Sequence, residues 1–392
     1  MDVRRQTSGV SASRRPVMQQ SVARFGETFS LRKKGVRDMP GKTSPREGSL
    51  RADAVHSVEQ LEDMLSEPSD GVVETLGRID GDIIVLGVGG KIGPSLARML
   101  RRASDAAGVH RRVIGVDLFP SGDQQSRLQS VGIETIRCDL LDPDQLQELP
   151  DAAGVIFMVG MKFGSTGQEA LTWALNAYLP GTVAQKYRGS RIIAFSTGNI
   201  YGLTPVSLGG AVETDPPNPQ GDYAMSALGR ERIFEHFSRS LGIPTALIRL
   251  NYAAELRYGV LVDIAQHVLA GEPVDLAMGN VNVMWQADAV RMTLRAFDYA
   301  SSPPFVLNVA GPELVSVRRA AEQFGSIMGK PVTFTGTESQ DALLSSGQLG
   351  HKLFGYPQVS AQQMIHWIAD WVARGGESLG KPTHFESRSG RF

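Results

Sequence analysis

A glycine-rich turn between an apolar run and an amphipathic stretch constrains this chain more than any other feature. The apolar run Ile83–Leu86 leads into Gly87-Val88-Gly89-Gly90-Lys91-Ile92-Gly93, and Ile92–Arg102 has helical periodicity. Glycines allow positive φ in a tight turn and let backbone N–H groups approach a ligand closely. The helix that follows points its positive N-terminal end at the same ligand. The spacing predicts a dinucleotide site on Gly87, Gly90, Lys91, Ile92 and Gly93, with an ordinary strand-to-helix turn as the alternative.

The acidic residue that ends the next apolar run indicates which dinucleotide is bound. Asp117 follows Val113–Val116 and stands 24 residues after Gly93. A carboxylate at this place accepts hydrogen bonds from both hydroxyls of an adenosine ribose and repels a 2′-phosphate. Leu118 and Phe119 come next, so no arginine adjoins Asp117 to bind that phosphate. We therefore expect NAD, rather than NADP, as the cofactor.

Strands and helices alternate along the chain from Gly81 to about residue 250. Such alternation is typical of a parallel sheet with helices on both faces. The sequence predicts an α/β fold, with a Rossmann-like doubly wound parallel sheet over residues 81–250 and a smaller C-terminal mixed α/β substrate region over residues 251–375, interleaved with the core. The expected strands are Ile83–Leu86, Val113–Val116, Thr135–Cys138, Val155–Val159, Ile192–Phe195, Thr245–Leu250 and Val306–Asn308, and the expected later helices are Gln168–Lys186, Leu261–Ala270, Val317–Met328 and Ala361–Ala373.

The two ends of the chain differ in composition from the middle. Residues 1–52 are rich in Arg, Ser, Gln and Gly and show no apolar periodicity. They are interpreted as a disordered basic tail, as sequence that precedes a true start at Met39, or as a transit peptide, which shares this composition. Residues 53–80 have a helical pattern and are expected to form short helices packed on the main domain. Residues 376–392, rich in Gly, Ser and charge, are expected to be a loose tail.

The totals exclude several classes of protein. The formal net charge is −1, which indicates neither nucleic acid nor an anionic membrane as a partner. A single cysteine, Cys138, excludes an internal disulfide framework, and the 7 histidines are scattered, so we expect no metal site. No apolar run approaches the roughly 18 residues that span a bilayer. We expect a cytoplasmic protein, with organelle targeting by residues 1–52 as the alternative.

Several motifs, in this order and spacing, resemble those of the NAD-dependent epimerase/dehydratase family, the extended short-chain dehydrogenase/reductases. The glycine turn is similar to that family's TGxxGxxG, with Leu86 in place of Thr. The resemblance covers about residues 82–375. Its other motifs are Phe195–Gly202, which resembles SSxxxVYG, Glu213–Tyr223, which resembles the first part of ExxPxxPxxxYxxSK, Trp285–Val290, which resembles (F/W)VxVxDVA, and Phe305–Gly311, which resembles FNVGG.

The resemblance implies roles for particular residues. Thr197 and Tyr223 occupy the positions of the family's catalytic Ser/Thr and catalytic Tyr. Asp139, with the adjoining Leu140, matches the Asp that lies beside the adenine. Lys162 matches a Lys that contacts the cofactor in 4-epimerases, and the alternative for it is a solvated surface lysine.

The sequence departs from the family at two places. Asn251 comes one position earlier than the Asn of RxxNVYGP, so its role as a substrate contact rests on a shifted match. The Lys of YxxxK is replaced by Ala227, which removes the cation that, in the family, lowers the pKa of the Tyr and binds the nicotinamide ribose. At an ordinary pKa of about 10, only about one phenol in a thousand is ionised at pH 7. Tyr223 is therefore expected to be a poor base that can still act as an acid or hydrogen-bond donor.

Arg230 is a candidate for the missing cation, because it lies seven residues after Tyr223 on the same helix face. The ordinary alternative for Arg230 is a solvated helix residue. Three interpretations stay open: an enzyme with a substitute cation, an enzyme that runs a redox-neutral or slow reaction with tightly held NAD, and a catalytically idle NAD-binding sensor or scaffold.

We favour an active enzyme that epimerises, dehydrates or oxidises a sugar or nucleotide sugar, a substrate class that the resemblance supplies. The resemblance also implies a homodimer, paired through the helices at Gln168–Lys186 and Tyr223–Ser240 as a four-helix bundle. RNA binding, known for some divergent relatives, is disfavoured, because the basic tail alone would have to provide it.

Overall fold

The computed structural model describes residues 54–120, 122–162 and 164–390. The chain divides into two units, Met1–Pro45 and Arg46–Phe392, and all the described residues belong to the second. The expectations for residues 1–52 fall outside the described residues.

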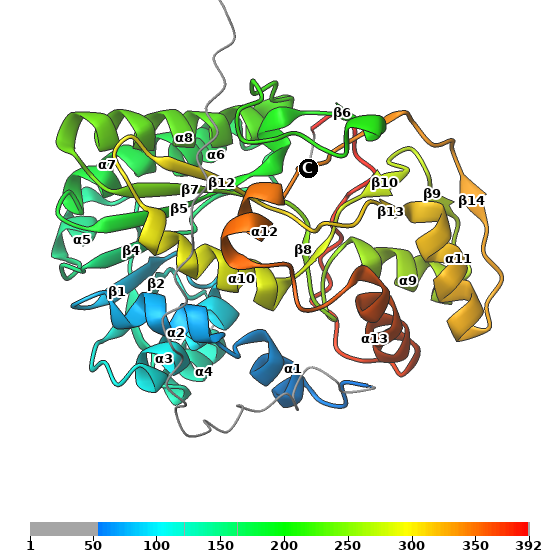
Figure 1. The fold of residues 1–392 in the computed structure, drawn as a ribbon, viewed down its shortest axis with the longest axis horizontal. Helices are drawn as coiled ribbons and strands as arrows, with labels where there is room; N and C mark the ends of the chain where they lie inside the picture. The colour runs from blue at the N-terminus through cyan, green and yellow to red at the C-terminus, as the bar shows by residue number, and fades with distance from the viewer. Residues whose placement is uncertain (1–53, 121, 163, 391–392) are drawn as a thin grey trace, which may run out of the picture. The chain divides into compact units, whose positions relative to one another are not determined.

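Helices and strands alternate through the described residues (Figure 1). The helices are α1 (Val58–Leu65), α2 (Asp70–Gly77), α3 (Gly93–Ala106), α4 (Gly122–Ser130), α5 (Pro143–Glu148), α6 (Glu169–Trp173), α7 (Leu179–Lys186), α8 (Gly221–Leu241), α9 (Val260–Ala270), α10 (Gln286–Arg295), α11 (Val317–Met328), α12 (Gln348–Phe354) and α13 (Ala361–Ala373). The π-helix η1 (Ala174–Tyr178) joins α6 to α7, and the 3-10 helices are η2 (Gly198–Tyr201), η3 (Val206–Leu208) and η4 (Ala296–Tyr299). The long strands are β1 (Ile83–Leu86), β2 (Val113–Asp117), β3 (Glu134–Arg137), β4 (Gly154–Phe157), β5 (Arg191–Thr197), β7 (Thr245–Leu250) and β12 (Phe305–Val309). The short strands are β6 (Thr204–Pro205), β8 (Ala253–Ala254), β9 (Val274–Asp275), β10 (Asn280–Val281), β11 (Met284–Trp285), β13 (Val315–Ser316), β14 (Phe334–Thr335) and β15 (Asp341–Ala342).

The long strands form one parallel sheet in the spatial order β12-β7-β5-β4-β1-β2-β3. The order reverses beside β1, because the chain runs outward through β2 to β3 and then crosses back to β4. In such sheets, ligands bind beyond the carboxyl ends of the strands at the point of reversal. A ligand site is therefore expected beyond the carboxyl ends of β1 and β4.

Alternate side chains of β1 enter two different hydrophobic clusters. Ile83 and Val85 belong to the cluster that includes residues of α3 and α10, whereas Ile84 and Leu86 belong to the cluster that includes residues of α7 and α8. Because both faces of the sheet are buried, its strands read as continuous apolar runs instead of alternating ones. The predicted Rossmann-like, doubly wound α/β fold is confirmed.

Residues 54–80 form α1 and α2, which pack on the first of these clusters. Leu61, Leu65 and Leu76 are fully buried, and α2 contacts both α3 and α10. The C-terminal part of the chain builds a second group of elements, in which α9, α11 and α13 pack on one another (Figure 1). Since β12 returns to the central sheet beside β7, the substrate region and the Rossmann core share strands.

The C-terminal residues differ from expectation. Residues 376–390 contain no helix or strand, but they are packed, so the expectation of a loose tail is wrong for them. Thr383 donates from its N and Oγ1 to Asp263 Oδ2 over 2.8 and 2.5 Å, and Phe385 is only 6% exposed. Arg388 Nη1 donates to the carbonyl oxygen of Ala277 over 3.1 Å. Polar anchors of this kind leave no periodic apolar pattern in a sequence.

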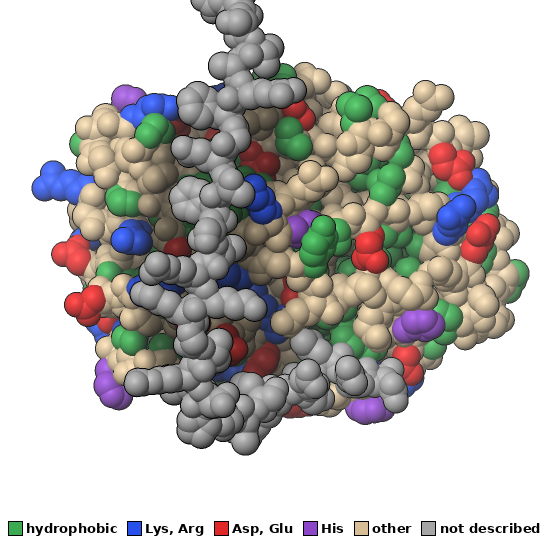
Figure 2. Space-filling model, viewed as in Figure 1, with side chains coloured by type: hydrophobic (Ala, Val, Ile, Leu, Met, Phe, Trp, Pro, Cys, Tyr) green, Lys and Arg blue, Asp and Glu red, His purple; other side chains and the backbone are tan. Residues whose placement is uncertain are grey.

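Acidic and basic side chains are interspersed over the visible face of the molecule, in keeping with the net charge of −1 (Figure 2). Within the described residues, no helix is both long and apolar enough to cross a bilayer.

Candidate active site

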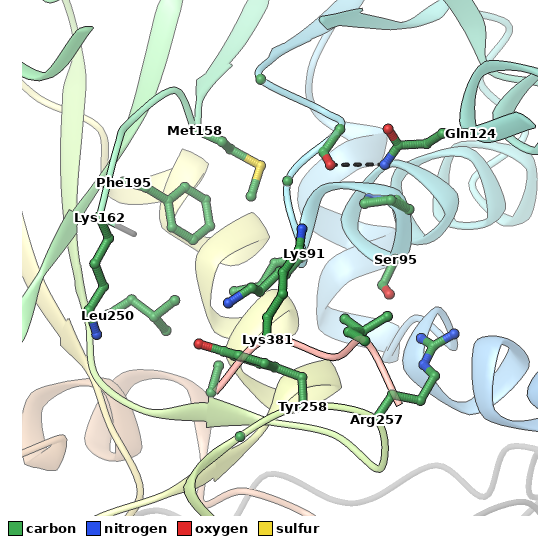
Figure 3. A pocket seen from close by; sticks show the side chains of 18 of the residues that line it. Lys91, Ser95, Gln124, Met158, Lys162, Phe195, Leu250, Arg257, Tyr258 and Lys381 are labelled. Carbon is green, nitrogen blue, oxygen red and sulfur yellow. Dashed lines mark hydrogen bonds between the residues drawn. The ribbon is translucent and has the colours of Figure 1, made fainter. Parts of the chain in front are cut away.

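A large cavity of about 1420 Å³ lies beyond the carboxyl ends of β1, β4 and β5, where the strand order reverses. Its walls come from the glycine turn, from the ends of β5 and β7, from α8 and from the C-terminal part of the chain (Figure 3). The predicted site residues that line it are Gly87, Gly90, Lys91, Ile92, Lys162, Thr197, Tyr223 and Asn251.

The turn between β1 and α3 has no room for side chains at two of its glycines. Gly87 has a φ of +85°, and a Cβ there would lie 2.9 Å from the backbone N of Val159. A Cβ on Gly93 would lie 2.1 Å from the carbonyl oxygen of Val88. These close approaches place the turn at the cavity wall and start α3 directly behind it, which is the arrangement that binds a pyrophosphate.

Asp117 lies beside this turn at the end of β2. Its Oδ2 accepts a hydrogen bond from the Gly89 N–H and its Oδ1 one from the Leu118 N–H, both over 2.8 Å. Gln124 Nε2 donates to the Gly89 carbonyl oxygen over 2.9 Å (Figure 3). These bonds hold the carboxylate against the turn, but Asp117 and Gly93 themselves do not line the cavity. Sequence reasoning missed Arg98 and Arg127, which also line the cavity.

Asp139 and Leu140 are not brought to the cavity wall. The Asp139 carboxylate is exposed and accepts a hydrogen bond from the Leu141 N–H over 3.0 Å, so it stabilises the turn after β3. Leu140 is 8% exposed and belongs to the second hydrophobic cluster. The roles implied for these two residues stay predictions without support from the geometry.

Thr197 and Tyr223 meet at the inner end of the cavity. Thr197 ends β5, Tyr223 lies in the first turn of α8, and a hydrogen bond joins their side chains. Burial raises the pKa of Tyr223, while the bond to Thr197 and the charge of Arg230 act in the opposite direction. The phenol is therefore neutral at pH 7 and carries a proton that it can donate.

Arg230 is buried, so its interpretation as a solvated helix residue is wrong. The side chain is 6% exposed, and Nη1 donates to the Phe195 carbonyl oxygen over 2.8 Å. Burial lowers the pKa of Arg230 to about 10, which leaves the guanidinium charged at pH 7. Ala227, in the place of the family's Lys, is fully buried in a small apolar cluster with Ile200 and Tyr201. Arg230 is thus a buried cation on α8 close enough to act on Tyr223.

The π-helix η1 supplies a partner for Arg230 that sequence reasoning missed. Asn176 is fully buried, and its Oδ1 accepts hydrogen bonds from Arg230 Nη2 over 2.6 Å and from the Met161 N–H over 3.1 Å. Its Nδ2 donates to Ser226 Oγ over 2.9 Å. Asn176 therefore fixes the guanidinium relative to α8, and short π-helical segments often occur at functional sites.

Glu231 and Arg249 form a buried ion pair that joins α8 to the sheet. Arg249 Nη2 lies 2.8 Å from Glu231 Oε2, and Ser196 Oγ donates to Glu231 Oε1 over 2.6 Å. Since Ser196 and Arg249 belong to adjacent strands and Glu231 to α8, the network fixes α8 against the sheet. This holds Tyr223 in register with Thr197.

Lys91 and Lys162 both point into the cavity (Figure 3). The Lys162 Nζ lies 6.0 Å from the centroid of the Tyr223 ring, and burial lowers the pKa of Lys162 to about 8. Lys162 is thus not a solvated surface lysine. The Lys91 Nζ lies 3.5 Å from the centroid of the Tyr258 ring, and burial lowers the pKa of Lys91 to about 7.

Asn251 also lines the cavity and is buried, and its Nδ2 donates to Asn282 Oδ1 over 2.7 Å.

The model of the NAD dependent epimerase/dehydratase family matches residues 83–310, which is more than half of the chain. The chain belongs to this family. As a member of the NAD-dependent epimerase/dehydratase family, it is an enzyme of the extended short-chain dehydrogenase/reductase type with NAD as its cofactor. The glycine turn and the start of α3 fit that cofactor, because Gly87 and Gly93 pack the turn closely without side chains and Asp117 holds the turn through the Gly89 N–H.

Solved structures of the same fold include several sugar-nucleotide enzymes. A UDP-glucuronic acid 4-epimerase from Bacillus cereus, solved with a UDP-sugar and NAD, is 20% identical with a TM-score of 0.62, over 75% of this chain and 99% of that one. The UDP-glucose 4-epimerase of Thermotoga maritima gives the same values. A dTDP-glucose 4,6-dehydratase from Bacillus anthracis, solved with NAD, is 14% identical with a TM-score of 0.64, over 75% of this chain and 96% of that one. A comparison with curated proteins finds no match.

Proposed function

We propose that this enzyme epimerises, dehydrates or oxidises a nucleotide sugar or a related sugar, with Thr197 and Tyr223 at the reacting carbon. The observation that carries the proposal is the hydrogen-bonded Thr197–Tyr223 pair, with buried Arg230 close to the phenol. Several of the similar solved structures contain UDP-glucuronic acid, UDP-glucose or an analogue, which supports the choice of substrate class. An active site with a substitute cation is favoured over an idle sensor, because the cation is present and charged.

The chain's own residues divide the chemistry between them. NAD, when bound, accepts and returns a hydride. The glycine turn, the start of α3 and Asp117 would hold it. Thr197 donates a hydrogen bond to the substrate oxygen. The phenolate form of Tyr223 takes the proton of the sugar hydroxyl during oxidation, and the neutral phenol returns a proton to the same oxygen during reduction. Arg230 stabilises the phenolate that remains, because a buried cation favours a nearby anion.

A substitution at Tyr223 tests this proposal. Tyr223→Phe should lower turnover of UDP-glucuronic acid, UDP-glucose or dTDP-glucose, whichever is the substrate, by about 10²–10⁴, the usual contribution of general acid–base catalysis. Affinity for NAD should stay the same, because the phenol is not among the groups that would hold the cofactor. Turnover is measured by product formation and affinity by calorimetry.

Three further variants make that result decisive. Tyr356→Phe removes a hydroxyl from a residue that is 75% exposed and should change neither quantity. Arg230→Met should lower turnover as well, and Arg230→Lys should restore part of it. If Tyr223→Phe keeps full activity on a sugar that the wild type converts, the assigned role of Tyr223 is wrong. If the wild type binds NAD but converts none of the three sugars, the idle sensor is favoured.

We also propose that the enzyme is a homodimer, paired through α6, η1 and α8. Leu171 and Tyr178 are 40% and 61% exposed on one helical stripe, and Met225 on α8 is 47% exposed. Apolar side chains spaced in this way on adjacent helices are typical of a surface that another protein covers. The dimer would leave the cavity wall formed by the C-terminal residues unaffected, since those lie on other elements.

A further inference from the structure

The C-terminal residues Glu377–Gly390, here called the C-terminal segment, form part of the cavity wall although they lie outside the residues that the family model matches. Glu377, Leu379, Lys381 and Thr383 line the large cavity. The Leu379 N–H donates to the carbonyl oxygen of Arg257, shortly before α9, over 3.1 Å. This active site is therefore shaped in part by residues that lie beyond the family pattern.

Side chains of the segment fix it to the C-terminal elements of the molecule. Figure 1 shows the segment, in red, running from the side of α9 toward β6. Thr383 is bonded twice to Asp263 of α9. Arg388 Nη1 donates to the carbonyl oxygens of Ala277 and Asp341 over 3.1 and 3.0 Å, and its Nη2 donates to Asp341 Oδ1 over 2.5 Å. Acceptors that a ligand between these elements could use are thus already occupied by the segment.

The other end of the segment reaches the start of α8, the helix that carries Tyr223. A Cβ on Gly390 would lie 2.2 Å from the carbonyl oxygen of Gln220, the N-cap residue of α8. A second cavity, of only about 10 Å³, remains between the segment and Asn199, which also lines the large cavity. This volume holds about one water molecule, so the segment fills the space beside Asn199.

The segment is packed as a wall, not as a lid that opens readily. Thr383 and Phe385 are 4% and 6% exposed, and Phe385 belongs to the first hydrophobic cluster. Segments that open easily have few buried apolar contacts. Displacing this segment would expose Phe385 and break the bonds of Thr383 and Arg388, so the packed position is strongly favoured.

The position of the segment limits the part of the cavity that is left for a substrate. The reacting carbon has to lie at Thr197 and Tyr223, and the cofactor would occupy the side of the glycine turn, from which the cavity continues along α3, α4 and α1. Away from the cofactor, the cavity ends at the start of α9 and at the C-terminal segment. A sugar attached to a nucleotide would have to extend into the space that the segment fills, whereas a small substrate would not.

We propose that the C-terminal segment takes the place of the nucleotide of a nucleotide sugar, so that the substrate is a free sugar or a similarly small polyhydroxylated molecule. This inference rests on the proposed function and narrows it to the smaller of its two substrate classes. A nucleotide sugar binds only to the fraction of molecules in which the segment is displaced, and its apparent affinity is reduced by that fraction. A free sugar avoids this cost.

Binding of a nucleotide to the full chain tests the proposal. The protein is saturated with NAD, so that the cofactor site is filled, and is titrated by calorimetry with UDP and with UDP-glucose. Thr383→Val combined with Arg388→Met removes side-chain bonds that fix the segment and increases the displaced fraction. Both ligands should bind to this double variant at least about tenfold more tightly than to wild type, because each lost charge-assisted bond stabilised the packed position.

Two further variants serve as a second test and a control. Gly390→Ala places a Cβ against the Gln220 carbonyl oxygen and should displace the end of the segment, which raises UDP affinity without loss of a side-chain bond. Arg319→Met, at an exposed residue of α11, should leave UDP affinity as in wild type. Affinity for NAD and the melting temperature show that each variant is folded. The proposal is overturned if wild type binds UDP-glucose as tightly as the double variant does, or if neither the double variant nor Gly390→Ala binds UDP more tightly than Arg319→Met does.

Turnover separates this proposal from the proposed function. Wild type is assayed with UDP-glucose and with glucose, galactose and glucuronate, by NADH absorbance and by chromatography of the sugars. Product from a free sugar and none from UDP-glucose is expected. If wild type converts UDP-glucose in a reaction that depends on Tyr223, the proposed function stands and this proposal fails. If the double variant gains UDP binding but neither protein converts any sugar, the proposed function fails and the segment still excludes the nucleotide.

Discussion

Asp117 illustrates how one carboxylate sets a preference between two cofactors. Backbone N–H groups on either side of it hold its oxygens at the glycine turn. Asp117→Ala removes two acceptors for the ribose and the repulsion of a 2′-phosphate, so the preference for NAD over NADP should narrow about tenfold or more. Calorimetry with NAD and with NADP measures the two affinities and so the preference. Asp139→Ala, which changes an exposed carboxylate away from the cavity wall, should leave the preference unchanged. Equal affinity of the wild type for both cofactors would contradict the role of Asp117.

Lys91 should make stability depend on pH in the protein without ligand. Burial lowers its pKa to about 7, from about 10.4 in an unfolded chain. Between these two values the unfolded chain binds more protons, so the free energy of unfolding rises with pH, and below pH 7 the full cost of a buried charge is present. Lys91→Met removes that cost, in part offset by the lost contact with Tyr258. We expect the variant to gain about 1–3 kcal/mol relative to wild type at pH 7, and less at pH 10.

Urea unfolding at several pH values measures this difference. Lys352→Met, at an exposed residue of α12, is the control, and its effect on the free energy of unfolding should be independent of pH. If the gain from Lys91→Met is the same at pH 7 and pH 10, Lys91 is not held at a lowered pKa in the folded protein.

At the scale of elements, the sequence predicted best what depends on neighbours along the chain. The strand, turn and helix from Ile83 to Ala106 follow from apolar runs and glycines that are adjacent in sequence. Helices α11 and α13 were predicted with the bounds that the structure has, because each has a Ser N-cap and a clear apolar periodicity. Thr197 and Tyr223 were predicted as a pair from motifs alone, and the structure places them in contact.

The elements that the sequence did not reveal depend on contacts between distant segments. The π-helix η1 interrupts a stretch with ordinary helical composition, and only the folded structure shows that Asn176 serves Arg230. Arg230 was also interpreted as a solvated residue, because its neighbours in the sequence do not indicate that this face of α8 is buried. Residues 377–390 have no periodic apolar pattern, so their packing on Asp263 could not be predicted.

In the molecule as a whole, the active site is built from segments that lie far apart in the sequence. The Rossmann sheet supplies the glycine turn and Thr197, and the segment after β7 supplies Tyr252 and Tyr258. Residues 377–390 complete the wall, because they pack from Asp263 to the first residue of α8. Because the cavity wall includes residues from so many segments, only the folded chain brings these side chains together.

The proposed homodimer is a property of the whole molecule that can be tested separately from catalysis. A four-helix interface would cover the stripe of Leu171 and Tyr178, and stable interfaces bury roughly 1,200–2,000 Å². Sedimentation should therefore show twice the mass of the chain for the wild type. Leu171→Asp combined with Tyr178→Asp places two charges in the interface core and should give a monomer. Leu208→Asp, at a residue that is 74% exposed on η3, should stay dimeric. A monomeric wild type, or a dimer that survives both charges, would show that these helices do not pair.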